Sequence, residues 1–208
     1  FLPSDWPADA PLVLLAGQGG QYSYPWEMVK AAQAKGADLR LLSLKGETTD
    51  ELKSLFASDK IREVAVGDLG GLLKSLKDLD AKGVILAGQV TPGRLFKDVF
   101  PDLRAVALIA SLKEKNAETI FGAICTEIEK IGARVLDARA FMADQMADSG
   151  LMIRGDEHVS QEAIDHAIHI AEKMAALNIG QSAVTRKGTV LAVEAFEGTD
   201  QMITRAGQ

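Results

Sequence analysis

Short apolar runs alternate with helix-like segments between residues 12 and 87 of this 208-residue chain, and this alternation restricts the fold more than any other feature. The run at 12–16, Leu-Val-Leu-Leu-Ala, is apolar throughout, as in a strand of a parallel sheet buried on both faces. Further strands are expected at 39–44, 61–66 and 84–87, with helices at 25–36, 49–57 and 69–79. This order predicts an α/β fold with a Rossmann-like parallel sheet and right-handed crossovers.

The same four residues, Leu-Ala-Gly-Gln, close the first and the fourth of these strands, at 15–18 and 86–89. In open α/β sheets, ligands bind beyond the carboxyl ends of the strands, where the strand order reverses. Glycine lets a backbone approach a ligand closely, so these turns supply candidate substrate-binding residues: Gly17, Gln18, Gly19, Gly88 and Gln89. Ordinary βα-turn chemistry, in which glycine is common, stays open as the alternative.

The glycine-rich turn at 17–22 differs from a dinucleotide-binding loop in detail. Tyr22 stands where G-x-G-x-x-G requires its third glycine, and Ser43 and Leu44 end the second strand without the usual acid. A nicotinamide cofactor is therefore not expected. We interpret the turn as a loop that contacts phosphate or sugar.

The pattern becomes helical after the fourth strand. Residues 93–131 are expected to be mostly helical, 133–136 to form a further strand, and 139–147 a short helix. The single cysteine, Cys125, lies among apolar residues at helical spacing, so we expect a buried structural thiol in a reducing compartment.

A connector at 149–159 precedes a second unit. Ser160 is a credible N-cap for a long helix. The helix has an apolar face comprising Ala163, Ile164, Ala167, Ile168, Ala171, Met174 and Ala175. We expect a Rossmann-like domain over 11–150 and the start of a second, smaller α/β domain over 151–208. On the same helix, His166 and His169 share a side with Glu162, where a solvated polar surface is favoured over a metal site.

A predicted hairpin with a turn at 186–188 is followed by three acids. These candidate metal ligands are Glu194, Glu197 and Asp200. Thr199 is a plausible helix N-cap, which would place the acids beside free backbone N–H groups. A divalent cation and phosphate oxygens could share such a site. Solvated edge groups with simple capping remain the alternative.

Asp200 is the candidate catalytic residue, because a carboxylate at a helix start can bind Mg²⁺ or orient water. Strand alternation should direct one of Glu194 and Glu197 toward the site. The remaining candidate substrate-binding residues of this segment are Gln181, Ser182, Lys187, Gly198 and Thr199.

The net charge of −6 and the pI of about 5.1 argue against nucleic acid as a partner, because binding phosphate backbones requires clustered Lys and Arg. If the ligand is a phosphate ester, a bound metal must supply much of the neutralising charge. No apolar run approaches the roughly 20 residues of a membrane helix, and no signal peptide is visible at the start. We expect a cytoplasmic protein.

The chain resembles the LpxI family, the UDP-2,3-diacylglucosamine pyrophosphatases of bacterial lipid A synthesis. The similarity is longest over 190–205, Val-Leu-Ala-Val-Glu-Ala-Phe-Glu-Gly-Thr-Asp-Gln-Met-Ile-Thr-Arg. Shorter stretches of similarity lie at 15–19, 67–70, 86–90 and 101–104. In the first of them the family's usual Ala-Gly-Asn-Gly is Ala-Gly-Gln-Gly. The resemblance implies hydrolysis of UDP-2,3-diacylglucosamine to 2,3-diacylglucosamine 1-phosphate (lipid X) and UMP, with Mg²⁺ or another divalent cation and with Asp200 essential.

A lipid-linked nucleotide-sugar substrate suggests a peripheral position at the inner membrane, and a homodimer is expected. Members of the family continue for some tens of residues beyond the Glu-Gly-Thr-Asp motif, so we expect this chain to be truncated at its C-terminus. Competing hypotheses are a non-catalytic nucleotide-sugar binding protein, an oxidoreductase and a purely structural protein.

Overall fold

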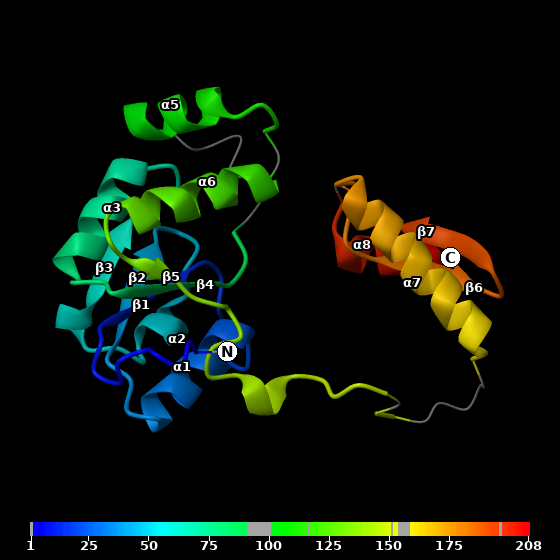
Figure 1. The fold of residues 1–208 in the computed structure, drawn as a ribbon, viewed down its shortest axis with the longest axis horizontal. Helices are drawn as coiled ribbons and strands as arrows, with labels where there is room; N and C mark the ends of the chain where they lie inside the picture. The colour runs from blue at the N-terminus through cyan, green and yellow to red at the C-terminus, as the bar shows by residue number, and fades with distance from the viewer. Residues whose placement is uncertain (1, 91–100, 116, 151, 154–158, 196) are drawn as a thin grey trace. The chain divides into compact units, whose positions relative to one another are not determined.

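The chain divides into two compact units, Phe1–Met146 and Ala147–Gln208, in the computed structural model (Figure 1). The structure describes residues 2–90, 101–115, 117–150, 152–153, 159–195 and 197–208. The division falls shortly before the predicted connector at 149–159, part of which lies outside the described residues. None of the described helices is long and apolar enough to span a membrane.

A five-stranded parallel sheet forms the centre of the N-terminal unit, in the order β3-β2-β1-β4-β5. Its strands are β1 (Leu12–Ala16), β2 (Leu39–Leu44), β3 (Ile61–Val64), β4 (Gly83–Ala87) and β5 (Arg134–Val135). The chain runs outward from β1 to β3 and then returns to place β4 on the other side of β1. The strand order therefore reverses between β1 and β4, and the predicted α/β fold is confirmed.

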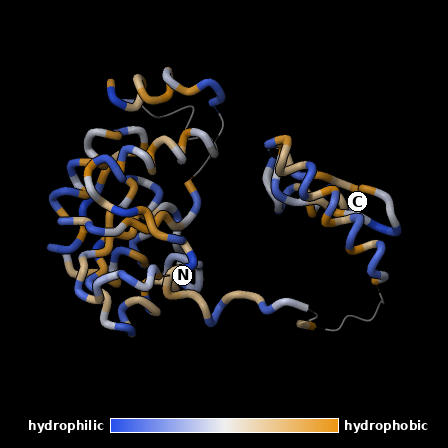
Figure 2. Tube along the Cα trace, viewed as in Figure 1, coloured by the Kyte–Doolittle hydropathy of each residue, from blue (hydrophilic) through white to orange (hydrophobic). Residues whose placement is uncertain are grey.

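Helices cover both faces of this sheet (Figures 1 and 2). They are α1 (Tyr24–Ala34), α2 (Asp50–Lys53), α3 (Leu69–Asp78) and α6 (Ala117–Lys130), with the short η1 (Ser58–Lys60) before β3. Successive residues of β1 point to opposite faces: Leu14 packs in a cluster with Met28 of α1, and Val13 in another with Leu76 of α3. Because both faces are covered, the central strands β1 and β4 are apolar at consecutive positions.

The helix predicted at 139–147, in the segment after β5, does not form. In place of the helix predicted at 139–147, only the short η2 (Ala143–Gln145) forms. Phe141 adopts a φ of 68°, which a continuing α-helix does not allow. Tight turns form instead, in which the backbone carbonyls of Asp137 and Arg139 accept hydrogen bonds from the backbone N–H groups of Ala140 and Met142.

The predicted helical region at 93–131 contains α5 (Leu103–Ser111) and α6, and 93–100 lies outside the described residues. Asp102 is the N-cap of α5, with its carboxylate accepting from Ala105 N at 2.7 Å. Cys125 on α6 is half-buried rather than buried, and burial is the main factor that raises the pKa of its thiol.

The C-terminal unit consists of α7 (Gln161–Ala176), the antiparallel hairpin of β6 (Ala183–Arg186) and β7 (Thr189–Val193), and α8 (Thr199–Ala206). Ser160 caps α7 as predicted, with its hydroxyl accepting from Ala163 N at 3.3 Å. Lys187 and Gly188 form the hairpin turn with φ values of 49° and 79°. Positive φ at both positions is typical of the two-residue turns that suit the twist of a hairpin.

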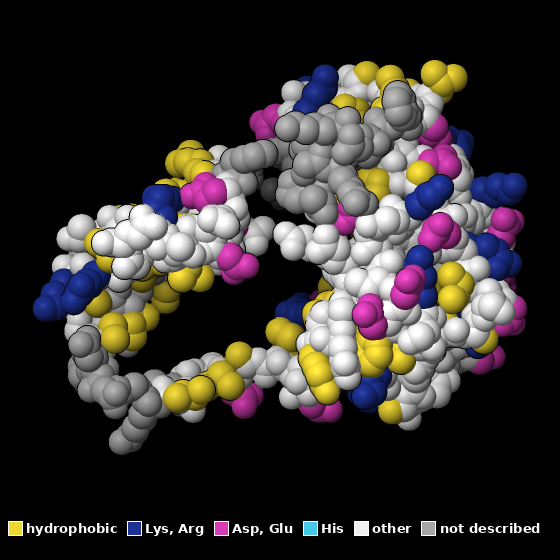
Figure 3. All heavy atoms as spheres, turned by 180° about the vertical axis from the view of Figure 1, so that it is seen from behind, with side chains coloured by type: hydrophobic (Ala, Val, Ile, Leu, Met, Phe, Trp, Pro, Cys, Tyr) yellow, Lys and Arg dark blue, Asp and Glu magenta, His cyan; other side chains and the backbone are white. Residues whose placement is uncertain are grey.

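Few hydrophobic side chains of this unit are buried. Among its described residues, Ala192 and Met202 are the buried hydrophobics, whereas Ile164 and Ile168 of the predicted apolar face are 40% and 51% exposed. Hydrophobic side chains are visible on the surface of the unit (Figure 3). His166, expected on a solvated surface, is half-buried, and its Nε2 atom is enclosed. The packed face of α7 therefore includes His166 and leaves Ile164 and Ile168 exposed, so it differs from the face predicted by the apolar pattern.

Candidate functional site

The two Leu-Ala-Gly-Gln repeats lie side by side at the carboxyl edge of the sheet, where the strand order reverses. Gly17 N donates to Ala87 O at 2.9 Å and Gln18 N donates to Gln89 O at 2.7 Å. A Cβ on Gly17 would overlap the Gln89 carbonyl, and one on Gly88 would overlap the Gln18 carbonyl. Gly88 also has a φ of 81°. The glycines are therefore required for the two turns to pack against each other. This structural role supports the alternative interpretation, in which they are ordinary βα-turn residues.

The turn after β2 supports the glycine-rich loop with two consecutive side chains, Thr48 and Thr49. Thr48 is buried; its Oγ1 accepts from Leu44 N at 2.7 Å and donates to Ala16 O at 2.6 Å. Thr49 Oγ1 donates to Gly19 O at 2.8 Å. These contacts fix the end of β1 and the loop that follows it.

Glu47 is a buried carboxylate at the same edge, only 4% exposed, and it accepts from Gln18 Nε2 at 3.3 Å. It orients the amide of a predicted substrate-binding residue. The sequence analysis missed Glu47. Its position shortly after the predicted strand at 39–44 was the available signal, because functional residues of open α/β sheets lie beyond the carboxyl ends of the strands.

A second acid that the sequence analysis missed, Asp137, follows β5. Its carboxylate accepts from Arg139 N at 2.8 Å, from Nε at 3.0 Å and from Nη2 at 2.6 Å. The side-chain hydrogen bond from Arg139 is the main reason that the pKa of Asp137 is lowered to about 2. Tyr24, at the start of α1, has a raised pKa because burial and the charge of Asp137 both disfavour its phenolate. The ionised Asp137 is thus neutralised by Arg139, and the phenol of Tyr24 stays neutral.

In the C-terminal unit, Glu194 brings together several predicted site residues. Its backbone N donates to Ser182 O at 2.9 Å. Its carboxylate accepts from Gln181 N at 3.3 Å and from Thr199 Oγ1 at 3.0 Å. A Cβ on Gly180 would overlap the Glu194 carbonyl, so the loop before β6 lies directly against the end of β7.

The start of α8 differs from the prediction. Gly198, with a φ of 84°, is the N-cap, and Thr199 is the first helical residue. The predicted Thr199 cap is therefore wrong, because the hydroxyl donates to Glu194 rather than accepting a helix N–H. Glu197 is paired with Arg205 at 2.6 Å. A hydrogen bond from its own backbone N–H and then the Arg205 contact lower the pKa of Glu197.

The three predicted metal ligands do not converge on a common point. Within the described ranges, no group of three or more His, Cys, Asp or Glu side chains could hold a metal ion. Asp200 is exposed in the first turn of α8, and its carboxylate has no hydrogen-bond or ion-pair partner among the described residues. A three-acid cage thus does not fit these residues, and Asp200 is left as a single exposed carboxylate. Lys187 lies at the hairpin turn, at the opposite end of the hairpin from Glu194.

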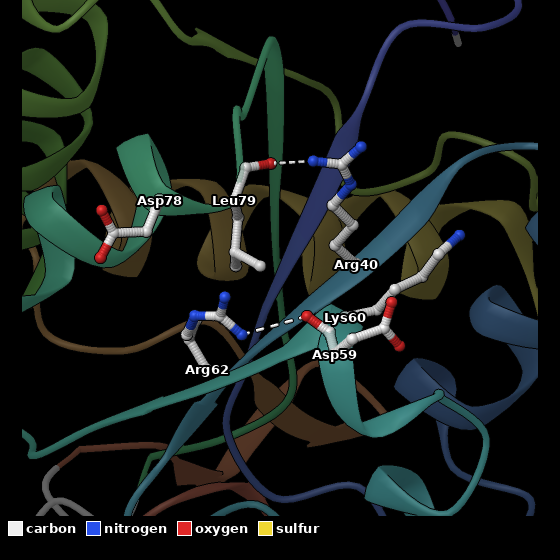
Figure 4. Close-up of a pocket in the computed structure, with 6 residues that line it drawn as sticks. All are labelled: Arg40, Asp59, Lys60, Arg62, Asp78 and Leu79. Carbon is white, nitrogen blue, oxygen red and sulfur yellow. Dashed lines mark hydrogen bonds between the residues drawn. The ribbon is translucent and has the colours of Figure 1, made fainter.

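A separate hollow of about 240 Å³ opens near the amino ends of β2 and β3 (Figure 4). It is lined by Arg40, Asp59, Lys60, Arg62, Asp78 and Leu79. Its cationic groups bond within the protein: Arg40 and Lys60 to Asp38, and Arg62 to the Asp59 carbonyl. Ligands in open α/β sheets bind at the other edge, so we do not assign the site here.

The fold and these residues define a two-domain α/β protein with loops at the reversal point of its sheet and an exposed carboxylate at a helix start. Residues 11–145 match the LpxI N-terminal domain, and residues 148–208 match the LpxI C-terminal domain. The UDP-2,3-diacylglucosamine pyrophosphatase LpxI of Caulobacter vibrioides is 30% identical over 200 residues, covering 93% of this chain and 68% of that protein. The chain belongs to the LpxI family.

Proposed function

We propose that this chain is a hydrolase that cleaves the pyrophosphate bond of UDP-2,3-diacylglucosamine in lipid A synthesis, releasing 2,3-diacylglucosamine 1-phosphate and UMP. The observation that carries this proposal is the match to both LpxI domains, with a relative named as a pyrophosphatase aligned over 93% of the chain. Hydrolysis adds water across one phosphoric anhydride bond, so no redox cofactor takes part.

Asp200 is the residue to which we assign the chemistry. It is exposed and lacks a described protein partner, so its carboxylate can accept a hydrogen bond from the attacking water and orient it. The first turn of α8 adds backbone N–H groups that favour anionic phosphate oxygens nearby. Gln181 and Ser182 lie beside the same turn through their contacts with Glu194, where they can bind the substrate.

Further substrate-binding residues are proposed in the loops at the carboxyl edge of the N-terminal sheet. Gly17, Gln18, Gly19, Gly88 and Gln89 supply closely packed backbone there, and Glu47 fixes the Gln18 amide. Mg²⁺ is the proposed cofactor, and Asp200 is the residue that would hold it. The cation would neutralise diphosphate charge that a chain of net charge −6 does not.

The experiment is UMP release by the purified protein supplied with Mg²⁺ and UDP-2,3-diacylglucosamine. We expect turnover by the wild type and a loss of at least about 100-fold in Asp200→Asn, comparable with removal of a key electrostatic group. Glu162→Gln is the matched control, because Glu162 is also an exposed acid in the first turn of a helix. Tight substrate binding without UMP release would instead support the non-catalytic nucleotide-sugar binding protein.

A lipid-linked substrate also leads us to propose that the protein works in the cytoplasm at the surface of the inner membrane. Co-sedimentation with vesicles containing the substrate, compared with vesicles lacking it, tests this. The homodimer remains a prediction, which light scattering of the purified protein would check.

A further inference from the structure

Glu194 is contacted by two segments that are far apart along the C-terminal unit. The loop before β6 contacts its Oε2 through Gln181 N, and the first residue of α8 contacts its Oε1 through the Thr199 hydroxyl. The backbone N of Glu194 donates to Ser182 O, so the loop and the end of β7 are held twice. The carboxylate therefore bridges the loop to the helix.

The turn between β7 and α8 is held from its other side by Arg205. This guanidinium donates to Val193 O at 3.0 Å and to Glu197 at 2.6 Å. Two of the three acids in this segment are thus engaged with partners inside their own unit. Asp200 is the remaining one, and it follows Thr199 directly.

The start of α8 has no side-chain cap, because its N-cap is Gly198. Glycine offers no side-chain oxygen, so the backbone N–H groups of the first turn have no side-chain acceptor from the N-cap residue. Among the described residues, the hydrogen bond from Thr199 to Glu194 is the side-chain contact that fixes the first helical residue. The direction of the neighbouring Asp200 carboxylate depends on that residue.

We propose that Glu194 is a positioning residue rather than a metal ligand: it holds Thr199 so that Asp200 faces the scissile diphosphate. This inference rests on the proposed hydrolytic function. A misplacement of about 1 Å in a catalytic group can cost on the order of 100-fold in rate, so the effect should appear in kcat. Thr199→Val breaks only the contact with α8, so its ground-state binding should change little. Glu194→Ala also releases Gln181 N, a proposed substrate-binding group, so its KM is not a test of positioning.

The test compares Glu194→Ala, Glu194→Gln, Thr199→Val and Thr199→Ser. Glutamine can still bridge, accepting from Gln181 N and donating to the Thr199 oxygen, but it carries no charge for a metal. We expect Glu194→Ala and Thr199→Val to lower kcat about 10- to 100-fold, with KM within about twofold in Thr199→Val. Glu194→Gln and Thr199→Ser should stay within about threefold of the wild type. Thr204→Val is the matched control, since it removes a hydroxyl bonded to Asp200 O on the same helix.

Two further measurements separate positioning from metal binding and from simple unfolding. Hydrogen exchange without metal should quicken at 202–204, the first residues whose N–H groups bond within α8, in Glu194→Ala but not in Glu194→Gln, with Tm otherwise near the wild-type value. The half-saturating Mg²⁺ concentration should be the same in Glu194→Gln as in the wild type. Glu194→Ala and Thr199→Val combined should be no worse than the stronger single variant, because they break the same contact.

Three outcomes would overturn the inference. If Glu194→Gln loses as much kcat as Glu194→Ala and needs more Mg²⁺, then Glu194 is a ligand. If Thr199→Val turns over like the wild type, then the bridge does not position Asp200. A wild type that releases no UMP refutes the proposed function together with this inference, whereas an active wild type with an unaffected Thr199→Val refutes the inference alone.

Discussion

Gln18 and Gln89 are joined backbone to backbone across the carboxyl edge of the sheet, with Gln18 N donating to Gln89 O at 2.7 Å. The pair closes the point where the strand order reverses between β1 and β4. Its geometry depends on Gly17, because a Cβ there would overlap the Gln89 carbonyl, which is backbone and cannot swing aside.

Gly17→Ala should therefore destabilise the N-terminal unit by about 1–3 kcal/mol, the range for overpacking a closed site. Thermal denaturation should show a Tm about 2–10 °C lower for a chain of this length. Gly20→Ala is the control, since a Cβ on Gly20 meets no described atom within 4 Å. Equal Tm values for the two variants would show that the turns move apart easily.

Removing the Thr48 hydroxyl should be costly although Val has a similar shape. Thr48→Val leaves both Leu44 N and Ala16 O without their partner in a buried position. Each unsatisfied buried group costs about 1–3 kcal/mol, so we expect a loss of roughly 2–4 kcal/mol in urea denaturation. Thr126→Val, which removes an exposed hydroxyl bonded to Gly122 O, should change stability little. A small effect of Thr48→Val would mean that water replaces the hydroxyl.

Asp102 links two helix starts, since its carboxylate accepts from Gly70 N and Ala105 N, each at 2.7 Å. Partial desolvation raises the pKa of Asp102, but backbone hydrogen bonds from Ala105 and Gly70 outweigh it, and the pKa lies below its ordinary value of 3.8. A lowered folded-state pKa gives stability that is present above 3.8 and is lost as pH falls through the folded value.

Asp102→Asn turns one acceptor oxygen into a donor facing a backbone N–H, so it should cost about 0.5–2 kcal/mol at neutral pH. In denaturation experiments the difference from the wild type should shrink as the pH falls below 3.8 through the lowered folded-state pKa, because the wild-type carboxylate then becomes protonated. A difference that stays constant over this range would contradict the assignment. The Asp102→Ser variant, which keeps a capping oxygen without a charge, should lack this pH dependence.

The pKa of Glu197 tests the Arg205 contact directly. Arg205→Met removes the guanidinium, so the Glu197 pKa should rise toward its ordinary value of 4.5 in a carbon-detected NMR titration. It should not reach that value, because the hydrogen bond from its own backbone N–H remains. Asp137, whose pKa of about 2 depends on Arg139, is the internal reference and should not shift. An unchanged Glu197 pKa would show that the ion pair does not form in solution.

Much of the N-terminal fold follows from local patterns. The runs at 12–16 and 39–44 coincide with β1 and β2, because strands covered on both faces are mostly apolar: β1 is apolar throughout, and β2 is interrupted only by Arg40 and Ser43. Ser160 was recognisable as the N-cap of α7 by its position before the helical pattern. The helix predicted at 139–147 failed because its chain reversal depends on Phe141 at positive φ and on the Asp137–Arg139 pair, neither of which has a periodic signature.

The candidate site could be predicted only in part. Asp200 stood out as an acid near a helix start, but the use of Glu194 as a bridge and of Glu197 as an ion-pair partner could not be read from spacing. Glu47 was missed because nothing in its immediate neighbourhood shows that it will be buried against Gln18.

By itself, then, the order of residues determined which segments become strands and helices here, since periodicity and capping act over a few neighbouring positions. Tertiary structure alone decided which glycines meet across the sheet and which carboxylates are occupied by the protein's own donors. Those contacts join segments separated by many residues, and their geometry exists only after the chain has packed.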